Sequence, residues 1–444
     1  MVTLIMAAKQ ELEEPVELPP MTLKPGGSTP AAQWVNGEKI LSAPGYPTLV
    51  LILADAFANW VQTIALDFTA HHATIRFQID GIWRDMPPMD RQTGDYMLVV
   101  LKQLADLDFR ERDERQDGSF TAELFLKKYK CKVRCQPVPT GERVAINIEL
   151  PRPSPEDLAT MGMRPKAVEM VRSFFRRKTG LIISATLPGD GASTLWMGVK
   201  AAGDRFISDY VTLEPKGQQE PDVINVNSIE YEPQQGFKAA LDKLMLREPD
   251  AVFVPNVREL GMLQSMLASN KRYERLLVAQ IHARSALDAV YRLLVMGLTP
   301  QEISDALIGV VNKRLVRRLC DNCKQSYQPD PATLARLGIA VGRVREFFAP
   351  FDPVMFAETD SKGQTVLPPP CDFCQGVGYF GRLGLFEVLE NNDDLKQVLH
   401  GGKTLNESQE FLHSRGLRSF REEGIAAIAL GQTSIEEVQR VLKS

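Results

Sequence analysis

The sequence predicts an α/β protein in which a domain with a mostly parallel sheet follows a smaller α+β domain. Two observations support this prediction. Residues 180–195 have the pattern of a buried strand, a glycine-rich turn and a helix start, and strand and helix signals alternate from residue 210 to residue 281. In addition, four of the six cysteines form two C-x-x-C pairs. Strands that alternate with helices favour a parallel sheet with helices on both faces.

Length and composition bound the class of protein. The chain has 444 residues, 44% of them hydrophobic, which is enough to bury two or three cores. Its net charge of −4 leaves no global basic field that would recruit nucleic acid or anionic lipid, so any basic surface must be local. No apolar run approaches the roughly 20 residues that span a bilayer, and the N-terminus lacks the charged start of a signal peptide. We therefore expect a cytoplasmic protein whose paired cysteines hold metal rather than disulfides.

Two segments are expected to lack regular structure. Residues 1–44 are rich in Pro, Glu and Gly without a sustained period, which is typical of a disordered tail. Pro151, Pro153 and Pro155 break regular structure, so we predict a linker over residues 151–164.

Between these segments, residues 45–150 are predicted to form the α+β domain. Helix signals cover 49–60 and 97–107, and alternating strands meet at a tight turn at Asp80 and Gly81. Further alternating segments follow to the end of the domain. A domain of about a hundred residues is an ordinary size for one hydrophobic core.

Residues 165–444 are predicted to contain the parallel sheet. We expect helices over 165–176, 236–246 and 260–269, and strands over 210–213, 251–254 and 276–281. The last segment, residues 391–444, is predicted to be helical, with capping boxes that begin at Thr404 and Ser434.

The glycine-rich loop, residues 186–193, has the layout of a phosphate-binding loop. In a loop of the form G-x-x-x-x-G-K-[ST], backbone N–H groups surround the phosphates, the lysine reaches the β- and γ-phosphates and the hydroxyl holds Mg²⁺. Here Thr186 stands at the first glycine, Gly191 at the second, Ala192 at the lysine and Ser193 at the hydroxyl. The loop thus keeps the second glycine and the hydroxyl residue of this pattern but lacks the positively charged lysine. A structural strand-to-helix turn with no nucleotide is the alternative.

The cysteine spacing is the sharpest chemical signal. Two C-x-x-C pairs bring four thiolates together, and tetrahedral zinc is the usual outcome, with redox or core cysteines as the alternative. The four candidate ligands are Cys320, Cys323, Cys371 and Cys374. By contrast, Cys131 and Cys135 alternate with charged residues in a predicted strand, which favours two small buried side chains.

These stretches together resemble the secretion ATPase family that powers type II secretion and type IV pilus assembly. The resemblance covers residues 51–442. The stretches that carry it are Arg76-Phe77-Gln78-Ile79-Asp80-Gly81, Gln116-Asp117-Gly118, Glu248-Pro249-Asp250-Ala251-Val252-Phe253-Val254, Arg314-Leu315-Val316-Arg317-Arg318-Leu319-Cys320, Cys371-Asp372-Phe373-Cys374-Gln375-Gly376 and Gly381-Arg382-Leu383-Gly384-Leu385-Phe386-Glu387.

The resemblance implies a more detailed fold than the periodicities do. It implies a RecA-like P-loop NTPase domain over residues 165–444, preceded by a PAS-like α+β domain. Within the NTPase domain it implies a four-cysteine zinc subdomain over residues 314–387 and a C-terminal helical bundle over residues 391–444.

The resemblance also places the catalytic positions of the family. Carried over residue by residue, they fall on Ala192, Ser193, Glu214, Asn256 and His282. Two of the five have lost the family's residue type. Alanine supplies no charge-assisted hydrogen bond, each worth about 1.5–3 kcal/mol, and an uncharged amide cannot act as a base.

Nucleotide contacts are expected from two sources. The loop offers Gly189, Asp190, Gly191, Ala192, Ser193 and Thr194, although Asp190 would place a negative charge inside the anion-binding loop. The α+β domain offers Arg76, Arg112 and Arg134, which match arginine positions of the family. For each arginine, a solvated surface charge is the alternative.

We therefore interpret the chain as a cytoplasmic ring subunit of a type II secretion or type IV pilus-like machine, with zinc and an inactive or weakened site for ATP and Mg²⁺. This makes it a pseudo-ATPase with a structural or regulatory role. The resemblance implies a homo- or hetero-hexamer, peripheral at the inner membrane through platform proteins or an active motor paralogue. One alternative is an unconventional ATPase that uses Lys200 or Lys216. A second is a zinc-ribbon nucleic-acid binder, suggested by Arg314, Arg317 and Arg318, although the net acidity leads us to expect no nucleic acid.

Overall fold

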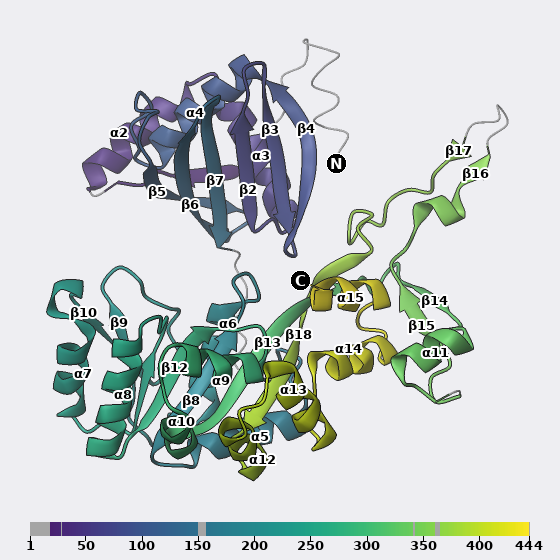
Figure 1. The fold of residues 1–444 in the computed structure, drawn as a ribbon. Helices are drawn as coiled ribbons and strands as arrows, with labels where there is room; N and C mark the ends of the chain where they lie inside the picture. Colours follow the sequence, from purple (N-terminus) through teal and green to yellow (C-terminus); the bar gives the residue numbers. More distant parts are fainter. Residues whose placement is uncertain (1–17, 28, 150–156, 341, 360–364, 444) are drawn as a thin grey trace. The chain divides into compact units, whose positions relative to one another are not determined.

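The protein is described here from a computed structural model, which describes residues 18–27, 29–149, 157–340, 342–359 and 365–443. The chain divides into two compact units, Met1–Pro153 and Ser154–Ser444, and each is treated by itself. Figure 1 shows the elements of both units with their labels.

Unit 1 contains a seven-stranded sheet in the order β1-β5-β6-β7-β2-β3-β4, and all its neighbouring strands are antiparallel. Helices pack on one face of this sheet (Figure 1). The strands are β1 (Met21–Lys24), β2 (Thr63–Phe68), β3 (His72–Ile79), β4 (Ile82–Asp90), β5 (Gln116–Leu124), β6 (Lys127–Val138) and β7 (Gly141–Glu149). The helices are α2 (Pro30–Leu41), α3 (Tyr46–Ala58) and α4 (Arg91–Leu104).

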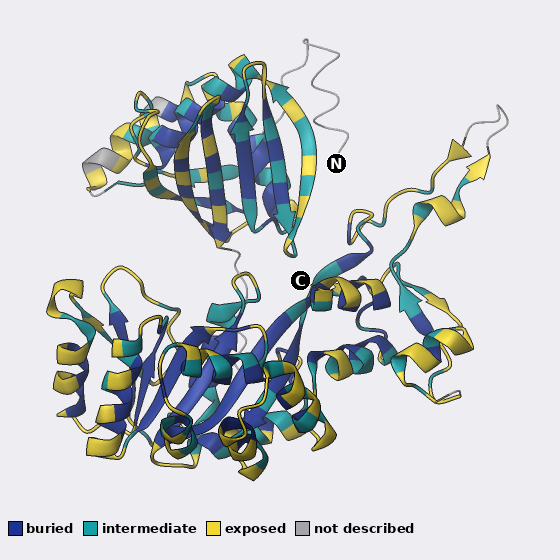
Figure 2. Cartoon of the chain, in the orientation of Figure 1, coloured by how far each residue is buried: buried dark blue, intermediate teal, exposed yellow. Residues whose placement is uncertain are grey.

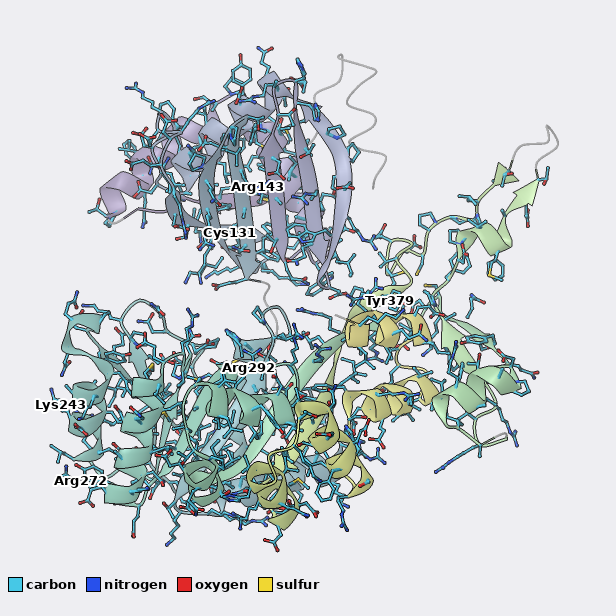
Figure 3. All side chains as sticks on the ribbon, viewed as in Figure 1. Cys131, Arg143, Lys243, Arg272, Arg292 and Tyr379 are labelled. Carbon is cyan, nitrogen blue, oxygen red and sulfur yellow. The ribbon has the colours of Figure 1, made fainter. Side chains whose placement is uncertain are left out.

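The alternating sequence of the strands explains which face of this sheet is buried. Along β6 every second residue from Tyr129 to Cys135 is buried, and the residues between them are exposed (Figure 2). Cys131, labelled in Figure 3, and Cys135 are both fully buried, which confirms the prediction made for them. Asp90 starts α4 by accepting a hydrogen bond from the backbone N–H of Thr93 at 2.9 Å.

The expected tail over residues 1–44 requires a correction. Residues 1–17 lie outside the described part, but β1 and α2 form within the rest of this segment. Met21 pairs with Leu124 on β5, and Ile40 is buried in the core of unit 1. Composition alone missed β1 because a four-residue edge strand carries almost no periodic signal.

Unit 2 is built on a second seven-stranded sheet in the order β10-β9-β11-β12-β8-β13-β18. The first six strands in this order, from β10 through β8 to β13, are parallel to one another, and β18 runs antiparallel to β13. The strands are β8 (Gly180–Thr186), β9 (Tyr210–Pro215), β10 (Val226–Tyr231), β11 (Ala251–Val254), β12 (Leu276–His282), β13 (Leu307–Leu319) and β18 (Tyr379–Glu390). The sheet helices are α5 (Pro165–Phe175), α6 (Ala192–Ala202), α7 (Phe237–Met245), α8 (Leu260–Tyr273), α9 (Ala286–Val295) and α10 (Pro300–Ala306).

Helices cover both faces of this sheet, as the alternation of strands and helices predicts. Consecutive residues of β8 point to opposite faces: Ile182 packs against α5 and α6, whereas Leu181 and Ile183 pack against α7, α8 and α9. The central strands are buried on both faces (Figure 2). This explains why they read as continuous apolar runs.

The expected linker over residues 151–164 is only partly described. Residues 151–156 lie outside the described part of the chain. The rest of the segment is not a free connection, because Leu158 and Met163 are buried against Trp196 in the core of unit 2. The core of unit 2 therefore begins before residue 165.

A smaller lobe lies between the C-terminal end of β13 and the N-terminal end of β18. It contains β14 (Gln325–Tyr327), α11 (Pro331–Leu337), β15 (Phe347–Ala349), β16 (Glu358–Thr359) and β17 (Thr365–Val366). The C-terminal helices are α12 (Asp393–His400), α13 (Leu405–Ser414), α14 (Phe420–Ala429) and α15 (Ile435–Lys443). The capping box at Thr404 forms with Glu407, as predicted. At Ser434 only half of the box forms, because Glu437 bonds to Arg317 instead.

Candidate functional site

The carboxyl ends of the parallel strands bring the predicted catalytic positions to one edge of the sheet. Thr186 ends β8 and His282 ends β12, and the two residues are paired in register. Glu214 lies near the end of β9, and Asn256 follows β11. In open α/β sheets this edge is where ligands bind.

The glycine-rich loop has the backbone that its sequence predicts. Gly189 and Gly191 have φ angles of 89° and 73°, which side chains other than glycine rarely adopt. Gly191 caps α6, and Ala192 is the first residue of that helix. A Cβ atom on Gly191 would lie 2.8 Å from the Lys313 Nζ, so another residue here would displace the end of that lysine in addition to straining the backbone.

Lys313 on β13 is a cation that contacts the loop. Its Nζ donates a hydrogen bond to the Gly191 carbonyl oxygen at 2.8 Å, and its side chain is buried. Lys313 pairs in register with Thr186, so the two side chains share a face of the sheet. Burial, reinforced by the positive charge of Arg382, lowers the pKa of Lys313 to about 7.

Asp190 also contacts β13 and not the interior of the loop. Its Oδ1 accepts a hydrogen bond from the Leu315 backbone N–H at 3.1 Å. Burial raises the pKa of Asp190, and the hydrogen bond from Leu315 and the charge of Lys313 act in the opposite direction. The negative charge expected inside the anion-binding loop is thus turned toward β13, and two consecutive loop residues are tied to the same strand.

The two lysines proposed from the sequence as substitutes have other partners. Lys200 donates to the Pro221 carbonyl oxygen at 2.8 Å. Lys216 is exposed and forms an ion pair with Glu232 at 2.6 Å. Neither contact involves the glycine-rich loop.

Glu214 and His282 keep side chains that could act near a nucleotide. Glu214 is buried and accepts hydrogen bonds from the Ser228 hydroxyl at 3.0 Å and the Glu220 backbone N–H at 3.3 Å. Burial raises the pKa of Glu214 above its usual value. The His282 Nδ1 lies 3.3 Å from the Thr186 carbonyl oxygen, and the ring is exposed at the strand end.

Asn256 has a different environment from a catalytic carboxylate. Its Oδ1 accepts two hydrogen bonds from Arg258, at 3.2 Å to Nε and 3.0 Å to Nη2. Its φ of 61° lies in the left-handed region, which asparagine tolerates better than most residues. The amide oxygen is therefore already occupied by a neighbouring guanidinium.

The three candidate arginines of unit 1 all form ion pairs within that unit. Their carboxylate partners are Asp67 for Arg76 at 2.8 Å, Asp95 for Arg112 at 3.7 Å and Asp117 for Arg134 at 2.8 Å. All three side chains are partly exposed, so these pairs are screened by solvent and add little stability.

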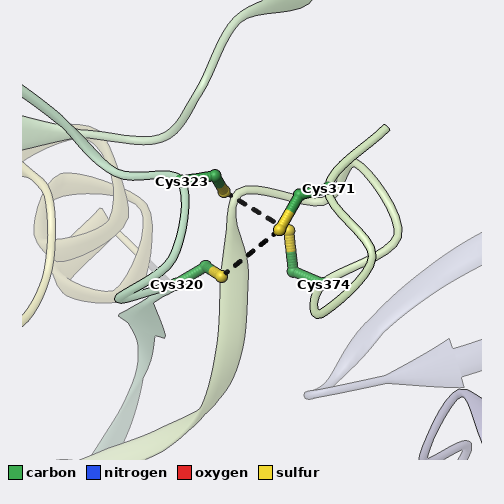
Figure 4. A group of neighbouring side chains, drawn as sticks. All are labelled: Cys320, Cys323, Cys371 and Cys374. Atoms are coloured by element: carbon green, nitrogen blue, oxygen red, sulfur yellow. Dashed lines mark hydrogen bonds between the residues drawn. The ribbon is translucent and has the colours of Figure 1, made fainter. Parts of the chain in front are cut away.

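The four predicted metal ligands do converge (Figure 4). Their sulfur atoms all lie within 4.8 Å of one another, with 4.0 Å between the sulfurs of Cys320 and Cys371 and 3.5 Å between those of Cys323 and Cys374. Zn–S bonds of about 2.3 Å in a tetrahedron place sulfurs about 3.8 Å apart. The observed spacing fits zinc.

The local backbone also suits thiolates. The Gly378 N–H donates to the Cys374 sulfur at 3.3 Å, a contact that stabilises negative charge on sulfur. Backbone hydrogen bonds from Cys374 and Phe373 lower the pKa of Cys371 to about 7. Burial raises the pKa of Cys320 and Cys323, and a bound metal cation would favour their thiolate forms instead.

The basic cluster beside Cys320 is engaged within the protein. Arg314 donates to the Val441 carbonyl oxygen at 2.7 Å, Arg317 pairs with Glu437 at 2.8 Å, and Arg318 pairs with Asp321 at 2.7 Å. These contacts give the arginines structural roles and leave little support for the nucleic-acid interpretation.

Sequence reasoning missed Lys313 and Arg258. The available signal for Lys313 was a charged residue after the apolar run 307–311, in a strand that the periodicity did not identify. For Arg258 the signal was its spacing of two residues from Asn256, but this spacing does not specify that the two side chains bond.

The sequence also matches known proteins over most of its length. The family described as "Type II/IV secretion system protein" matches residues 42–440. The chain is 25% identical over 401 residues to the type II secretion system protein HxcR of Pseudomonas aeruginosa, covering 90% of this chain and 78% of that protein. It is also 25% identical to the type IV pilus assembly ATPase PilB of Thermus thermophilus, covering 87% of this chain but 42% of PilB.

A solved structure shares the fold. The ATPase DotB of Legionella pneumophila matches with a TM-score of 0.56 and 12% identity, over 97% of this chain and 98% of DotB. At this identity the match shows the fold alone. Together with the mixed α/β architecture and the four-cysteine cluster, it confirms the fold class predicted from the sequence.

Proposed function

Because the chain belongs to the type II/IV secretion system protein family, we propose that it is a ring subunit of a type II secretion or type IV pilus-like machine that turns over ATP at or near background. The subunit would act structurally or as a regulator of an active motor. Relatives described as a type II secretion protein and a pilus assembly ATPase support the coarser assignment to such machines.

One observation carries the proposed loss of hydrolysis: the charged groups needed for phosphoryl transfer are missing or engaged elsewhere. Ala192 stands where a lysine would meet the phosphates, and the lysine that contacts the loop, Lys313, donates to the Gly191 carbonyl oxygen. Asn256 stands where a carboxylate would orient water, and Arg258 binds its oxygen. Phosphoryl transfer depends on positive charge at the transferred group and on a positioned nucleophile.

The loop retains some capacity for anions. Its backbone N–H groups at the start of α6 favour negative charge, so weak binding of ATP with Mg²⁺ is compatible with slow turnover. We propose that the residues from Gly189 to Thr194 make this contact. Glu214 and His282 would line the site without replacing the lost charges.

We further propose one structural zinc ion in the four-cysteine cluster. Four thiolates would fill all four coordination positions and leave none for a substrate, so the ion would be structural and not catalytic. By joining the two C-x-x-C pairs it would stabilise the lobe between β13 and β18. The sulfur spacing and the Gly378 contact to Cys374 support this proposal.

The assembly is proposed to be a homo- or hetero-hexamer on the cytoplasmic face of the inner membrane, held there by platform proteins or a motor paralogue. The finding that no helix among the described residues has the length and apolarity to cross a bilayer is compatible with such recruitment. Sedimentation should show an oligomer, alone or with candidate partners. A strict monomer in every mixture would contradict this assembly.

The test of the proposed function is nucleotide affinity with and without Mg²⁺, measured beside turnover on the same preparation. We expect weak or undetectable affinity and turnover at background. Turnover of about one per second or faster, within the ordinary enzyme range, would contradict the proposal.

One observation favours a second candidate, an unconventional ATPase. Lys313 brings a buried cation to Gly191, and a lysine from another strand could supply the charge that Ala192 lacks. In that case ATP turnover would be measurable and Lys313→Ala would abolish it, whereas Lys200→Ala and Lys216→Ala would not.

A further inference from the structure

The turn between β5 and β6 exposes two large apolar side chains. Leu124 and Lys127 are cross-strand partners, so Phe125 and Leu126 alone form the loop. Phe125 is 73% exposed and Leu126 is 92% exposed. Contact of this apolar surface with water is unfavourable, and neither side chain packs in the core of unit 1.

The backbone of this turn makes the choice of residues more unusual. Phe125 and Leu126 have φ angles of 47° and 65°, so both lie in the left-handed region. Two-residue hairpin turns with positive φ at both positions strongly prefer Asn-Gly, because bulky side chains are crowded in that conformation. The fold of unit 1 therefore gains nothing from Phe-Leu that Asn-Gly would not provide better.

Three lysines follow this apolar turn along β6. Lys127, Lys128 and Lys130 are exposed on the first residues of β6, on the strand that leaves the turn. Lys127 lies over the ring of Trp60, with 5.7 Å from Nζ to the ring centroid. Among the residues that the structure describes, neither Lys128 nor Lys130 forms an ion pair.

The nearby carboxylates do not neutralise these lysines. Glu123 is the cross-strand partner of Lys128, but it pairs with Lys24 at 3.1 Å. Glu149 is the cross-strand partner of Lys130, but it pairs with Lys132 at 2.7 Å. Positive charge therefore remains at the tip, although the whole chain has a net charge of −4.

We propose that this tip, formed by Phe125 and Leu126 with Lys127, Lys128 and Lys130, is a docking site for an anionic lipid bilayer. The two apolar side chains enter the boundary between headgroups and acyl chains, and the ammonium groups meet the negative headgroups. Trp60, held beside Lys127, is of the residue type that favours the same boundary. An apolar pair at the end of a basic strand suits a membrane better than a nucleic acid, whose phosphates would make no use of Phe and Leu.

This inference goes beyond the proposed function and does not depend on it. Recruitment through partner proteins needs no lipid contact, and loss of hydrolysis involves residues of unit 2. Vesicle binding and ATP turnover are separate measurements, so either idea can fail while the other holds.

The test is co-sedimentation of the full chain with vesicles of phosphatidylcholine alone or of phosphatidylcholine with phosphatidylglycerol. We expect binding to the anionic vesicles, little binding to the neutral ones, and a decline as salt screens the charges. The double variant Phe125→Asn with Leu126→Gly should lose at least tenfold in vesicle partitioning. It should keep or raise the thermal midpoint, since it restores the residues that the turn prefers, and this separates membrane contact from folding.

Two further variants sharpen the result. Lys128→Gln with Lys130→Gln should weaken binding and reduce its salt dependence. Phe206→Ser with Ile207→Ser removes two exposed apolar residues of unit 2, which are 69% and 84% exposed, and should leave binding unchanged. Equal binding to neutral and anionic vesicles, no binding to either, or unaltered binding by the Asn-Gly variant would each overturn the proposal. The last two outcomes would point to a protein partner for the tip.

Discussion

Arg317 and Glu437 form an ion pair that joins β13 to α15, with a fully buried carboxylate and a partly exposed guanidinium. The Arg317 Nη2 lies 2.8 Å from the Glu437 Oε2, and the Arg317 backbone N–H donates to Oε1 at 2.9 Å. The ring of Tyr379, labelled in Figure 3, lies 4.0 Å from the guanidinium carbon. Burial opposes the charge of Glu437, but hydrogen bonds from Arg440 and Arg317 hold the pKa of Glu437 below its usual value.

Glu437→Gln should destabilise unit 2 by about 1.5–3 kcal/mol, the range for hydrogen bonds to charged groups, because the arginines left unpaired are partly exposed. Because the folded pKa is lowered, the stabilisation by Glu437 is complete above the unfolded value of about 4.3 and disappears as the pH falls through the folded pKa. The difference between the wild type and the variant in denaturant unfolding should therefore shrink at acidic pH. The exposed neighbour provides the control, and Glu436→Gln should change stability by less than about 0.5 kcal/mol. Similar effects of the two variants would contradict the role of the pair.

The protein should contain one equivalent of zinc when purified without chelator. Cys371→Ser should lose the metal and unfold the lobe that carries β14 to β17, while unit 1 keeps its structure, because the thiolates close a site that the unfolded chain lacks. Elemental analysis and hydrogen exchange measure the two effects. Cys131→Ser serves as the control, since it changes a buried cysteine of unit 1 and should retain the zinc. Less than half an equivalent in the wild type would contradict the prediction.

The central parallel strands were predictable because they are buried on both faces. The predicted strand 251–254 coincides with β11 (Ala251–Val254), where four consecutive apolar residues leave little choice. The edge strand β10 was not predicted, since its residues are intermediate or exposed and none of them is fully buried. β13 was missed for a different reason. Its polar second half is stabilised by residues distant in the sequence, such as Glu437. The local pattern of apolar and polar residues contains no information about such contacts.

The candidate sites differ in how far the sequence could define them. The metal site consists of the four cysteines alone, so the C-x-x-C spacing was enough to predict that their sulfur atoms converge. The loop frame was visible for the same reason, because Gly189 and Gly191 specify the backbone. The electrostatics of the loop were not visible, since they depend on Lys313 reaching Gly191 from a strand 122 residues away in the sequence.

Lys313 should make the stability of unit 2 depend on pH near neutrality. Its folded pKa of about 7 lies below the unfolded value of about 10.4, so between these values the unfolded chain binds more protons and stability rises with pH. The destabilisation by Lys313 is complete below the folded pKa and absent above the unfolded one. The charges that act on Lys313 are Arg382 on β18, which lowers its pKa further, and Asp190 on the loop, which opposes this.

Lys313→Gln should remove this dependence, which amounts to at most about 1.4 kcal/mol per pH unit. Thermal unfolding of the wild type and the variant between pH 6.5 and about pH 9 measures it, and the wild type should gain stability relative to the variant as the pH rises. Lys178→Gln, at an exposed lysine, should leave the slope unchanged. Parallel pH curves for the wild type and Lys313→Gln would show that Lys313 does not titrate in this range.

Restoring the lost catalytic groups should recover ATP turnover only in part. The change is Ala192→Lys with Asn256→Glu, which returns a cation and a carboxylate to one phosphoryl transfer, so their effects are not additive. Each restored contact could raise the rate by on the order of 10²–10³, the cost of losing one electrostatic contact in a preorganised site. Turnover should still remain below about one per second.

Three features of the site explain this ceiling. Position 256 has a φ of 61°, which glutamate adopts less readily than asparagine, and Arg258 would pair with the new carboxylate. A lysine at position 192 would also lie near the buried charge of Lys313, which already contacts Gly191. Ala192→Met with Asn256→Gln is the matched control, because it adds similar bulk without charge and should stay at background. Full activity of the restored variant would show that charge alone separates this chain from an active motor, and fast turnover by the unmodified protein would refute the proposed loss of hydrolysis.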